Sequence, residues 1–255
     1  MLSAAEYSRY SRHLLLDNFD EQAQTRLSQA KVVLFGVGGL GCQVASALVS
    51  AGLGELVLID DDNVELSNLP RQWLFAESDI GIKKAHAARA RLTAMHAAVT
   101  LRCITDYADT ASRDAHLASS QLIIDCTDSI TSRLAINSLA LEHSMPLVSA
   151  AASGFIATAA AYFPSETGPC YACPEYNSEQ SQTCLEQGIF SPVVAIAGQL
   201  QASMTLSYLS GMQTPDWGAL HHFNGQSLLM RRFSIQQNPD CPACAQHRRR
   251  NSHEH

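Results

Sequence analysis

The residues that could do chemistry begin with a glycine-rich turn that is followed by an acid. An apolar strand, KVVLF at residues 31–35, runs into GVGGLG at residues 36–41, and a second apolar strand ends at Asp60. Glycines let the backbone approach a polyphosphate, the amides that open the next helix attract its charge, and an acid about 20 residues further on can bind a ribose hydroxyl. The pattern predicts a nucleotide site; the alternative is a tight turn without a ligand. The residues of the site would be Gly36, Gly38, Gly39, Gly41 and Asp60.

Three charged residues further along the chain bear on which nucleotide chemistry occurs. A hydride-transfer enzyme has only to hold and orient NAD. That chemistry gives Arg71 and Lys84 no clear role. If ATP occupies the site, both cations can stabilise the charge that gathers on a leaving pyrophosphate. Asp128 can then hold Mg²⁺, because hard carboxylate oxygens suit that ion. Each charge alone would be read as a solvated surface group, but their order and spacing favour ATP-dependent chemistry.

Two Cys-x-x-Cys pairs form a second cluster of chemical groups. Four thiolates can close a tetrahedral Zn²⁺ site, and the x-x spacing lets the two ligands of a pair converge. We therefore expect a structural zinc that staples the C-terminal residues onto the loop after Phe163. A redox pair and cytosolic free thiols are the alternatives. The expected ligands are Cys170, Cys173, Cys241 and Cys244.

The remaining cysteines are one loop residue and three core residues. Cys184 lies in a long polar stretch, where a thiol is available for nucleophilic work. On residue type alone, a nucleophile and an inert thiol are equally good interpretations of Cys184. Cys42, Cys103 and Cys126 lie on or beside apolar elements, and we expect them to pack in the core.

Composition and charge exclude several classes of protein. The 255 residues are 46% hydrophobic and 16% charged, which fits a globular chain with a large core. The net charge of −7 gives no support to nucleic-acid binding, and no apolar run approaches the ~20 residues of a membrane span. Without an apolar N-terminal signal, the eight cysteines predict a cytoplasmic protein rather than a disulfide scaffold.

Alternating strands and helices must position these groups. Asn224-Gly225 predicts a two-residue turn in a hairpin within residues 220–231. The whole pattern predicts a single α/β domain, 1–255, with a Rossmann-like, doubly wound, mainly parallel sheet, a C-terminal antiparallel extension and a zinc-stapled loop. Periodicity predicts strands at residues 31–35, 55–60, 99–104, 121–125, 146–150 and 154–163, and helices at residues 4–16, 20–29, 39–51, 80–95, 130–143 and 193–209.

In this order the motifs resemble the ThiF/MoeB/HesA family of ubiquitin-activating-like adenylyltransferases. The resemblance covers nearly the whole chain, from RYSR at residues 9–12 to CPAC at residues 241–244. Besides the glycine turn and the cysteine pairs, its most specific parts are DDD at residues 60–62, LSNLPRQ at residues 66–72 and DCTD at residues 125–128. Within the family the chain looks most like the thiamine branch, with the molybdopterin branch as the near alternative.

The resemblance implies a homodimer that uses ATP and Mg²⁺ to adenylate the C-terminal Gly-Gly carboxylate of a small ubiquitin-fold sulfur carrier protein, releasing pyrophosphate, in thiamine (thiazole) biosynthesis. It divides the chain into a nucleotide-binding half at residues 31–150, a carrier-binding, zinc and crossover-loop half at residues 151–245, and a disordered tail at residues 246–255. The residues it implies around ATP and its metal are Gly36, Gly38, Gly39, Gly41, Asp60, Asp62, Ser67, Asn68, Arg71, Lys84, Asp128 and Ser129.

Two further roles follow from the resemblance alone. Arg12 matches an arginine that reaches into the partner subunit's site, and Cys184 matches the cysteine that can form an acyl-disulfide with the carrier in the thiamine branch. The resemblance also makes the two cysteine pairs zinc ligands. The implied catalytic residues are Arg12, Arg71, Lys84, Asp128 and Cys184.

The chain departs from the family pattern at several positions. Pro70 stands where the family usually has Gln, and Asn224 stands where a hairpin Asp is common. Ile82-Lys83 replaces a stretch that usually holds a proline, so Lys83 is a second candidate beside Lys84, which the register favours. No rhodanese-like domain follows the core, so we expect a separate sulfurtransferase or persulfide donor. An NAD-dependent oxidoreductase and a non-catalytic carrier-docking scaffold are the alternatives from other classes.

Overall fold

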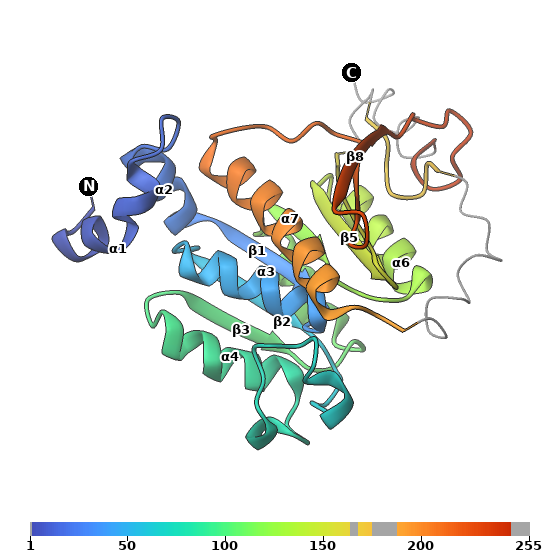
Figure 1. The fold of residues 1–255 in the computed structure, drawn as a ribbon. Helices are drawn as coiled ribbons and strands as arrows, with labels where there is room; N and C mark the ends of the chain where they lie inside the picture. The colour runs from blue at the N-terminus through green and yellow to red at the C-terminus, as the bar shows by residue number, and fades with distance from the viewer. Residues whose placement is uncertain (1, 164–167, 175–187, 246–255) are drawn as a thin grey trace.

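An eight-stranded sheet forms the centre of the computed structural model, which describes residues 2–163, 168–174 and 188–245 (Figure 1). Its order is β3-β2-β1-β4-β5-β6-β7-β8. Pairs from β3 to β5 are parallel, and pairs from β5 to β8 are antiparallel. This confirms the predicted sheet with its antiparallel extension. The strands are β1 Lys31–Phe35, β2 Glu55–Ile59, β3 Thr100–Ile104, β4 Leu122–Asp125, β5 Leu147–Ser153, β6 Ile156–Tyr162, β7 Ala219–Asn224 and β8 Leu229–Ser234.

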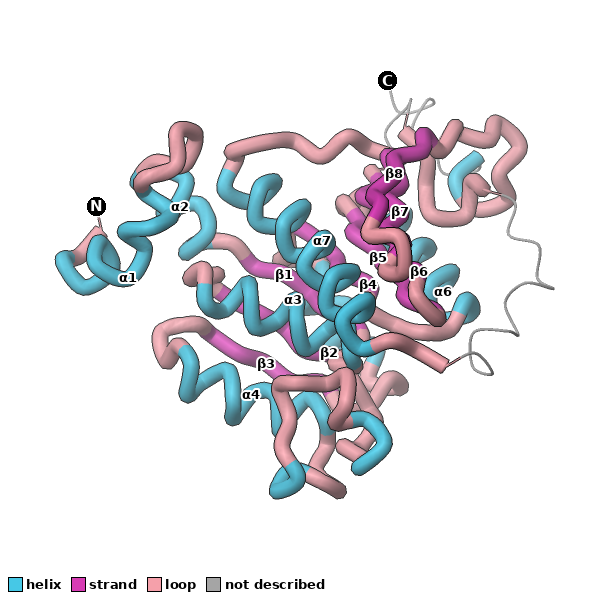
Figure 2. The backbone as a smooth tube through the Cα atoms, viewed as in Figure 1, coloured by secondary structure: helices cyan, strands magenta, loops and turns pink. Residues whose placement is uncertain are grey.

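Helices cover both faces of the parallel strands (Figure 2). Leu34 and Leu58 pack into one core with α3, α4 and α7, whereas Val33 and Val57 pack into a second core with α5 and α6. Strands buried on both faces need apolar residues at every position, which explains their continuous apolar runs. No helix in the described part of the chain is long and apolar enough to cross a membrane. The α-helices are α1 Ala4–Leu14, α2 Glu21–Gln29, α3 Gly39–Ser50, α4 Lys84–Met95, α5 Thr110–Leu117, α6 Ile130–Glu142 and α7 Ser191–Ser210, and the 3₁₀ helices are η1 Leu66–Asn68 and η2 Glu77–Asp79.

Helix α7 lies against α3 at backbone distance. A Cβ on Gly39 would lie 2.6 Å from Cγ1 of Val194, and a Cβ on Gly198 would lie 2.9 Å from the carbonyl oxygen of Leu40. Position 198 therefore has room only for glycine, whereas at position 39 the side chain of Val194 would have to move. The end of α7 is tied to α2, because Nε of Arg26 donates to the carbonyl oxygen of Ser210 at 2.5 Å. Helix α7 thus runs beside α3, from the glycine turn to α2.

Two helices differ from the sequence prediction. Helix α4 begins at Lys84, not at Ile80, because Gly81 has a φ of +85° and the backbone of residues 81 and 82 bonds to that of Val64. The exposed Ile80 and Ile82 mimic one more turn of apolar periodicity. Helix α5 is absent from the prediction because Leu117 is its only buried residue among those described, so no apolar pattern marks it.

The β7–β8 hairpin is present, but its turn is longer than predicted. Asn224 pairs with Leu229, which leaves residues 225–228 as the loop. Oδ1 of Asn224 accepts from the N–H of Gln226 at 2.9 Å and from that of Ser227 at 3.0 Å. The prediction of a two-residue Asn-Gly turn is therefore wrong, because the Asn224 side chain closes a wider loop as an Asx turn.

Candidate nucleotide and metal sites

The glycine turn lies between β1 and α3, at the edge of the sheet where the parallel strands end. Gly36 has a φ of +85°, and a Cβ there would lie 2.9 Å from the carbonyl oxygen of Cys126. A Cβ on Gly41 would lie 2.0 Å from the carbonyl oxygen of Gly36. Gly38 precedes α3 and offers its first turn no side-chain cap, so the first amides of α3 are left for another acceptor. Such a turn suits an anion.

Asp60 lies against this turn from the end of β2. Its Oδ2 accepts from the N–H of Val37 at 2.6 Å, and its Oδ1 accepts from the N–H of Asp62 at 2.9 Å. Burial raises the pKa of Asp60, although these bonds and nearby Lys84 favour its charged form. The structure therefore brings Asp60 to the glycine turn, as its spacing predicts. Its bond to a ribose remains a prediction.

Lys84 is buried at the start of α4. Its Nζ donates to Oδ2 of Asp62 at 2.7 Å, and its N–H donates to the carbonyl oxygen of the same residue at 2.9 Å. The Asp62 side chain is 69% exposed, whereas that of Lys84 is 9% exposed, so the pair faces solvent through its carboxylate. Nζ of the neighbouring Lys83 instead donates to the carbonyl oxygen of Asp61. Of the two candidate lysines, Lys84 is therefore the buried one, and its ammonium group is paired with Asp62.

Arg71 comes to the glycine turn from the segment after η1. Its carbonyl oxygen lies 3.3 Å from the place of a Cβ on Gly39, and its Nη1 donates to the carbonyl oxygen of Ser67 at 2.9 Å. Asn68 is buried: its Oδ1 accepts from the N–H of Glu65 at 3.3 Å, and its Nδ2 donates to Oγ of Ser67 at 3.3 Å. The LSNLPRQ segment therefore folds as one unit that places Arg71 beside the start of α3.

Gln72 belongs to this unit, and the sequence analysis gave it no role. It is 2% exposed, and its Nε2 lies 3.7 Å from the place of a Cβ on Gly38. Its Oε1 has no hydrogen-bond partner among the described residues. A buried amide whose Nε2 lies beside a helix start is a candidate phosphate ligand, because that nitrogen can donate to a phosphate oxygen. Its position directly after Arg71 is the signal that could have found it.

Asp128 and Ser129 follow β4, which pairs with β1 up to Asp125 and Phe35. Asp128 is exposed and has no hydrogen-bond partner within residues 2–163, 168–174 and 188–245. Oγ of Ser129 accepts from the N–H of Ser132 at 3.1 Å and so caps α6. The structure brings Asp128 to the edge that holds the glycine turn. The Ser129 side chain instead caps α6. Their contacts with metal and nucleotide remain predictions.

Arg12 does not reach this edge. It is exposed on α1, whose buried Tyr10 places its Oη 2.7 Å from Nε2 of His96 and 2.2 Å from where a Cβ on Gly52 would be. Gly52 and His96 follow the ends of α3 and α4, and α3 alone is about 18 Å long. Arg12 is therefore remote from the glycine turn of its own chain, as an arginine that acts in a partner's site must be.

The four predicted zinc ligands converge at one point. All four cysteines are buried, and their Sγ atoms lie within 4.8 Å of one another. Sγ of Cys170 lies 3.8 Å from that of Cys241 and 3.9 Å from that of Cys173, which lies 3.6 Å from that of Cys244. A tetrahedron with Zn–S bonds of 2.3 Å has edges of about 3.8 Å, so the residues fit zinc. The identity of the ion remains a prediction.

The protonation of these thiols also indicates a cation. Burial raises the pKa of Cys170, and burial and then the Cys173 side chain raise that of Cys244 to about 11. Burial opposes the charged form of Cys241 too, but hydrogen bonds from the backbone of Cys244 and Ala243 outweigh it and lower the pKa of Cys241. Thiolates at Cys170 and Cys244 therefore need a nearby positive charge to stabilise them. The predicted crossover loop spans residues 176–188, and its residues 176–187, with Cys184, lie outside the described residues, as does the tail at residues 246–255.

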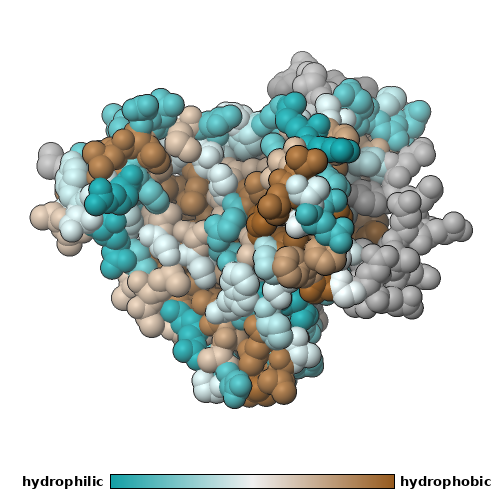
Figure 3. Space-filling model, viewed as in Figure 1, coloured by the Kyte–Doolittle hydropathy of each residue, from teal (hydrophilic) through white to brown (hydrophobic). Residues whose placement is uncertain are grey.

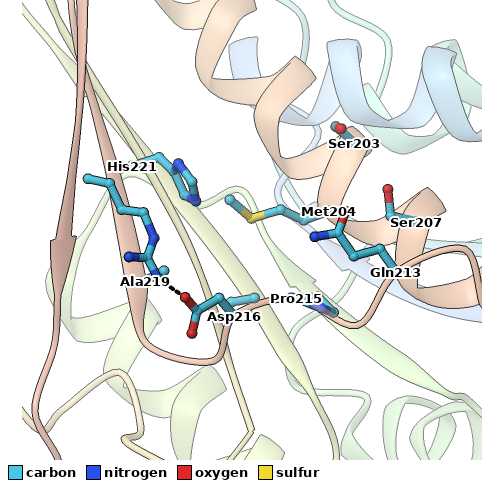
Figure 4. A pocket seen from close by; sticks show the side chains of 10 residues that line it. Ser203, Met204, Ser207, Gln213, Pro215, Asp216, Ala219 and His221 are labelled. Atoms are coloured by element: carbon cyan, nitrogen blue, oxygen red, sulfur yellow. Dashed lines mark ion pairs between the residues drawn. The ribbon is translucent and has the colours of Figure 1, made fainter.

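A pocket of about 320 Å³ lies near the C-terminal end of α7 (Figure 4). Asp216 and Arg232, which line the pocket, form an ion pair, and the His221 side chain points into the pocket. Because α7 meets the glycine turn near Val194 and this pocket only at residues 203–207, the pocket is separate from the nucleotide site. It is lined by Ala161, Ser203, Met204, Ser207, Gln213, Pro215, Asp216, Ala219, His221 and Arg232.

Comparison with known proteins agrees with this geometry, because the ThiF family profile matches residues 10–243. The chain belongs to the ThiF family. It is 37% identical over 242 residues to the sulfur carrier protein ThiS adenylyltransferase of Escherichia coli (strain K12), covering 94% of this chain and 95% of the relative. It is 33% identical over 246 residues to the molybdopterin-synthase adenylyltransferase of the same strain, covering 96% of this chain and 99% of the relative.

A solved structure agrees in fold. The crystal structure of E. coli MccB with ATP superposes with a TM-score of 0.82 at 24% identity, covering 95% of this chain and 75% of MccB. This ThiF-family membership and the names of the two relatives confirm the predicted family and the predicted nucleotidyltransferase activity.

Proposed function

We propose that this ThiF-family chain adenylates the C-terminal Gly-Gly carboxylate of a small ubiquitin-like sulfur carrier protein. The observation that carries the proposal is the gathering of the glycine turn, Arg71, the Lys84–Asp62 pair and Asp128 at one edge of the sheet. Doubly wound sheets bind ligands outside the carboxyl ends of their strands where the strand order reverses, and β1 lies at that reversal. The names of the two relatives indicate the class of carrier.

In the proposed reaction a carboxylate oxygen of the carrier attacks the α-phosphorus of ATP. The α–β anhydride bond breaks, and pyrophosphate leaves with the bonding electrons. The amides that open α3 hold the phosphates, and Asp60 binds the ribose. Arg71 and Lys84 supply positive charge where the leaving group gains negative charge. Mg²⁺, when bound, would add charge neutralisation at the phosphates, and the exposed carboxylate of Asp128 suits such a hard cation.

A further cation comes from a second subunit in this proposal. Arg12 is exposed and lies at the far ends of α3 and α4 from its own glycine turn. Leu15 and Leu16, directly after α1, are 73% and 53% exposed, as expected for residues that an interface covers. These observations support a homodimer in which Arg12 of one subunit reaches the partner's nucleotide.

The antiparallel half is the proposed carrier-binding half, residues 151–245, opposite a nucleotide-binding half at residues 31–150. Strand β8 ends the sheet and is exposed along its length. Its Leu229, Met230 and Phe233 are each about half exposed, and Figure 3 shows apolar surface around this hairpin. An apolar patch at a sheet edge suits a protein partner. We prefer a carrier of the thiamine branch, because identity is 37% to the ThiS enzyme and 33% to the molybdopterin-synthase enzyme.

The cysteines have two proposed uses. Zn²⁺ held by the four clustered thiolates joins the Cys170–Cys173 turn to the C-terminal residues, which lie outside the nucleotide site. A separate sulfurtransferase or persulfide donor supplies sulfur to Cys184; the resulting persulfide attacks the carrier's acyl-adenylate, AMP leaves, and an acyl-disulfide forms. The seven described cysteines form no disulfide with one another, which supports the cytoplasm as the compartment.

Carrier-dependent exchange of pyrophosphate into ATP tests the proposal. The assay compares a thiamine-type carrier, a molybdopterin-type carrier and versions of each that lack the final Gly-Gly. We expect exchange with the thiamine-type carrier and none with the shortened carriers. Stronger exchange with the molybdopterin-type carrier would move the chain to that branch. Tight NAD binding without exchange would favour an oxidoreductase, and carrier binding without exchange would favour a docking scaffold.

A further inference from the structure

Gln201 lies in the middle of α7 and is completely buried. Its Nε2 donates to the carbonyl oxygen of Asp125 at 2.7 Å and to that of Val148 at 3.3 Å, and its Oε1 accepts from Sγ of Cys126 at 3.4 Å. Asp125 ends β4, and Val148 lies in the neighbouring strand β5. One side chain therefore joins α7 to two strands. A buried amide is costly unless both of its ends are bonded, so this contact fixes the relative positions of its partners.

The Asp125 carboxylate holds the chain that follows β4. It is completely buried; its Oδ1 accepts from the N–H of Thr127 at 3.0 Å and from the hydroxyl of Thr127 at 2.7 Å. Its Oδ2 accepts from Oγ of Ser149 at 2.8 Å. The carbonyl oxygen of Thr127 in turn accepts from Nη2 of Arg133 at 2.8 Å. The segment from Asp125 to Thr127 is therefore held by α7, β5 and α6 just before the chain reaches Asp128.

The same segment forms one wall of the glycine turn. The N–H of Cys126 donates to the carbonyl oxygen of Phe35 at 2.8 Å, and a Cβ on Gly36 would lie 2.9 Å from the carbonyl oxygen of Cys126. Asp128 itself has no hydrogen-bond partner in the described part of the chain, so its place depends on the residues before it. A shift of Asp125 would therefore move Asp128 relative to the glycine turn.

We propose that Gln201 is a positioning residue that sets where Asp128 stands and therefore how tightly the chain binds the divalent cation that accompanies ATP. The inference rests on the proposed function, in which Asp128 is the metal-binding residue. Gln201 acts through Asp125 and Thr127. Without its amide, the carbonyl oxygens of Asp125 and Val148 lose the donor that Gln201 supplies, and the end of β4 loses its hydrogen bond to α7.

Gln201→Met tests the proposal, because methionine keeps the length and packing of the side chain but cannot donate to the carbonyl oxygen of Asp125 or of Val148. The first readout is the Mg²⁺ concentration that half-saturates carrier-dependent pyrophosphate exchange. The second needs no turnover: the Kd of Mn²⁺ for the protein with ATP, measured by electron paramagnetic resonance. We expect both values to rise about tenfold, as for loss of an outer-shell partner of a metal ligand, while the KM for the carrier stays within about twofold.

Two further variants separate positioning from loosening of the core. Thr205→Val changes a buried hydroxyl one turn further along α7 that has no hydrogen-bond partner in the described residues, and we expect wild-type metal dependence. Ser149→Ala removes one bond to the Asp125 carboxylate, and we expect a smaller rise in the same direction. Ser149→Ala also carries the test if Gln201→Met does not fold.

Unchanged Mn²⁺ affinity in folded Gln201→Met and Ser149→Ala would overturn the inference, as would an equal loss in Thr205→Val. Failure of the proposed function would give a different result: the wild-type protein would support no pyrophosphate exchange with any carrier. The Mn²⁺ affinities of the wild-type protein and the variants could still be compared with ATP alone.

Discussion

The two ends of the sheet hold their functional residues in different ways. In the parallel half, Asp60 and Lys84 are fixed by hydrogen bonds to residues at most 23 positions away in the sequence. In the antiparallel half, Cys170 and Cys173 meet Cys241 and Cys244 across a long stretch of chain, with few apolar side chains around them. The first region is specified by contacts of short and medium range, and the second by contacts between segments 71 residues apart.

This difference predicts different consequences of substitution. A side chain removed from the parallel half should change the chemistry and leave the fold, because a large apolar core supports the strands there. A ligand removed from the cysteine cluster should change the fold of its own region, because the cluster joins segments 71 residues apart and few apolar side chains surround it. The following experiments could break or sharpen this comparison.

The largest expected effect is the loss of structure on removal of a zinc ligand. A structural zinc contributes on the order of 10 kcal/mol of apparent binding free energy, so Cys241→Ser should release residues 168–174 and 241–245 while the parallel half stays folded. Hydrogen exchange follows the regions, and metal analysis should find one zinc per wild-type chain. Cys103→Ser, at a half-buried cysteine outside the cluster, is the matched control and should keep the metal. A metal-free wild-type protein with full protection at these residues would rule out the zinc staple.

The next effect is on catalysis. Arg71→Ala and Asp128→Ala should each lower carrier-dependent pyrophosphate exchange by at least about 10²-fold, because each removes a group that stabilises charge in the transition state. Their melting temperatures should stay near that of the wild-type protein. Arg89→Ala, at an exposed cation on α4, is the control for a general loss of positive charge. Exchange at the wild-type rate in both variants would contradict the assigned roles.

A smaller effect concerns two glycines that share one backbone conformation. Gly36 and Gly81 both have a φ of +85°, but a Cβ on Gly36 would meet the carbonyl oxygen of Cys126, whereas a Cβ on Gly81 would meet nothing within 4 Å. Gly81→Ala should lower the free energy of unfolding by about 1 kcal/mol through backbone strain, and Gly36→Ala by about 3 kcal/mol or more, because contact adds to strain. Urea denaturation measures both. Equal losses would show that the tight contact at the glycine turn has little weight.

The smallest expected effect depends on pH and concerns α1, which contacts the parallel half through Tyr10 and His96. Burial lowers the pKa of His96, Arg9 lowers it further, and Glu6 opposes them. Because the folded protein favours neutral His96, this contribution to stability is complete above the ordinary pKa of 6.5 and is lost as the pH falls below it. Protection factors of α1 amides should therefore fall from pH 8 to pH 5.5.

His96→Gln should remove most of this pH dependence. His86→Gln, at an exposed histidine of α4, is the control and should keep it. A pH dependence that persists in His96→Gln would assign it to another group.

The sequence predicted features that follow from residue spacing and missed features that depend on individual hydrogen bonds and backbone angles. The glycine turn and Asp60 were predictable because a strand, a turn and an acid at fixed spacing belong to one folding unit. The start of α4 was placed too early because the exposed Ile80 and Ile82 imitate a buried helical face, and only Gly81 opposes that interpretation. The hairpin loop was wrong because its width depends on how the Asn224 side chain bonds.

Other site features needed the structure. The four cysteines share a spacing that chemistry recognises, so their convergence was predictable although they are far apart. Gln201 carries no such mark, because a single glutamine in an apolar helix could face solvent or the core, and only its contacts with Asp125 and Val148 decide. Gln72 does lie directly after Arg71, but its burial beside Gly38 needed the structure.

The contact of α3 with α7 limits how this protein can be altered by evolution or by design. Even a methyl group at Gly198 would meet the backbone of α3 and push the two helices apart. Such a push would displace the amides that open α3 and Gln201 together. New substrate preferences must therefore arise in the loops and edge strands, while the close contact between α3 and α7 is kept as the rest of the sequence changes.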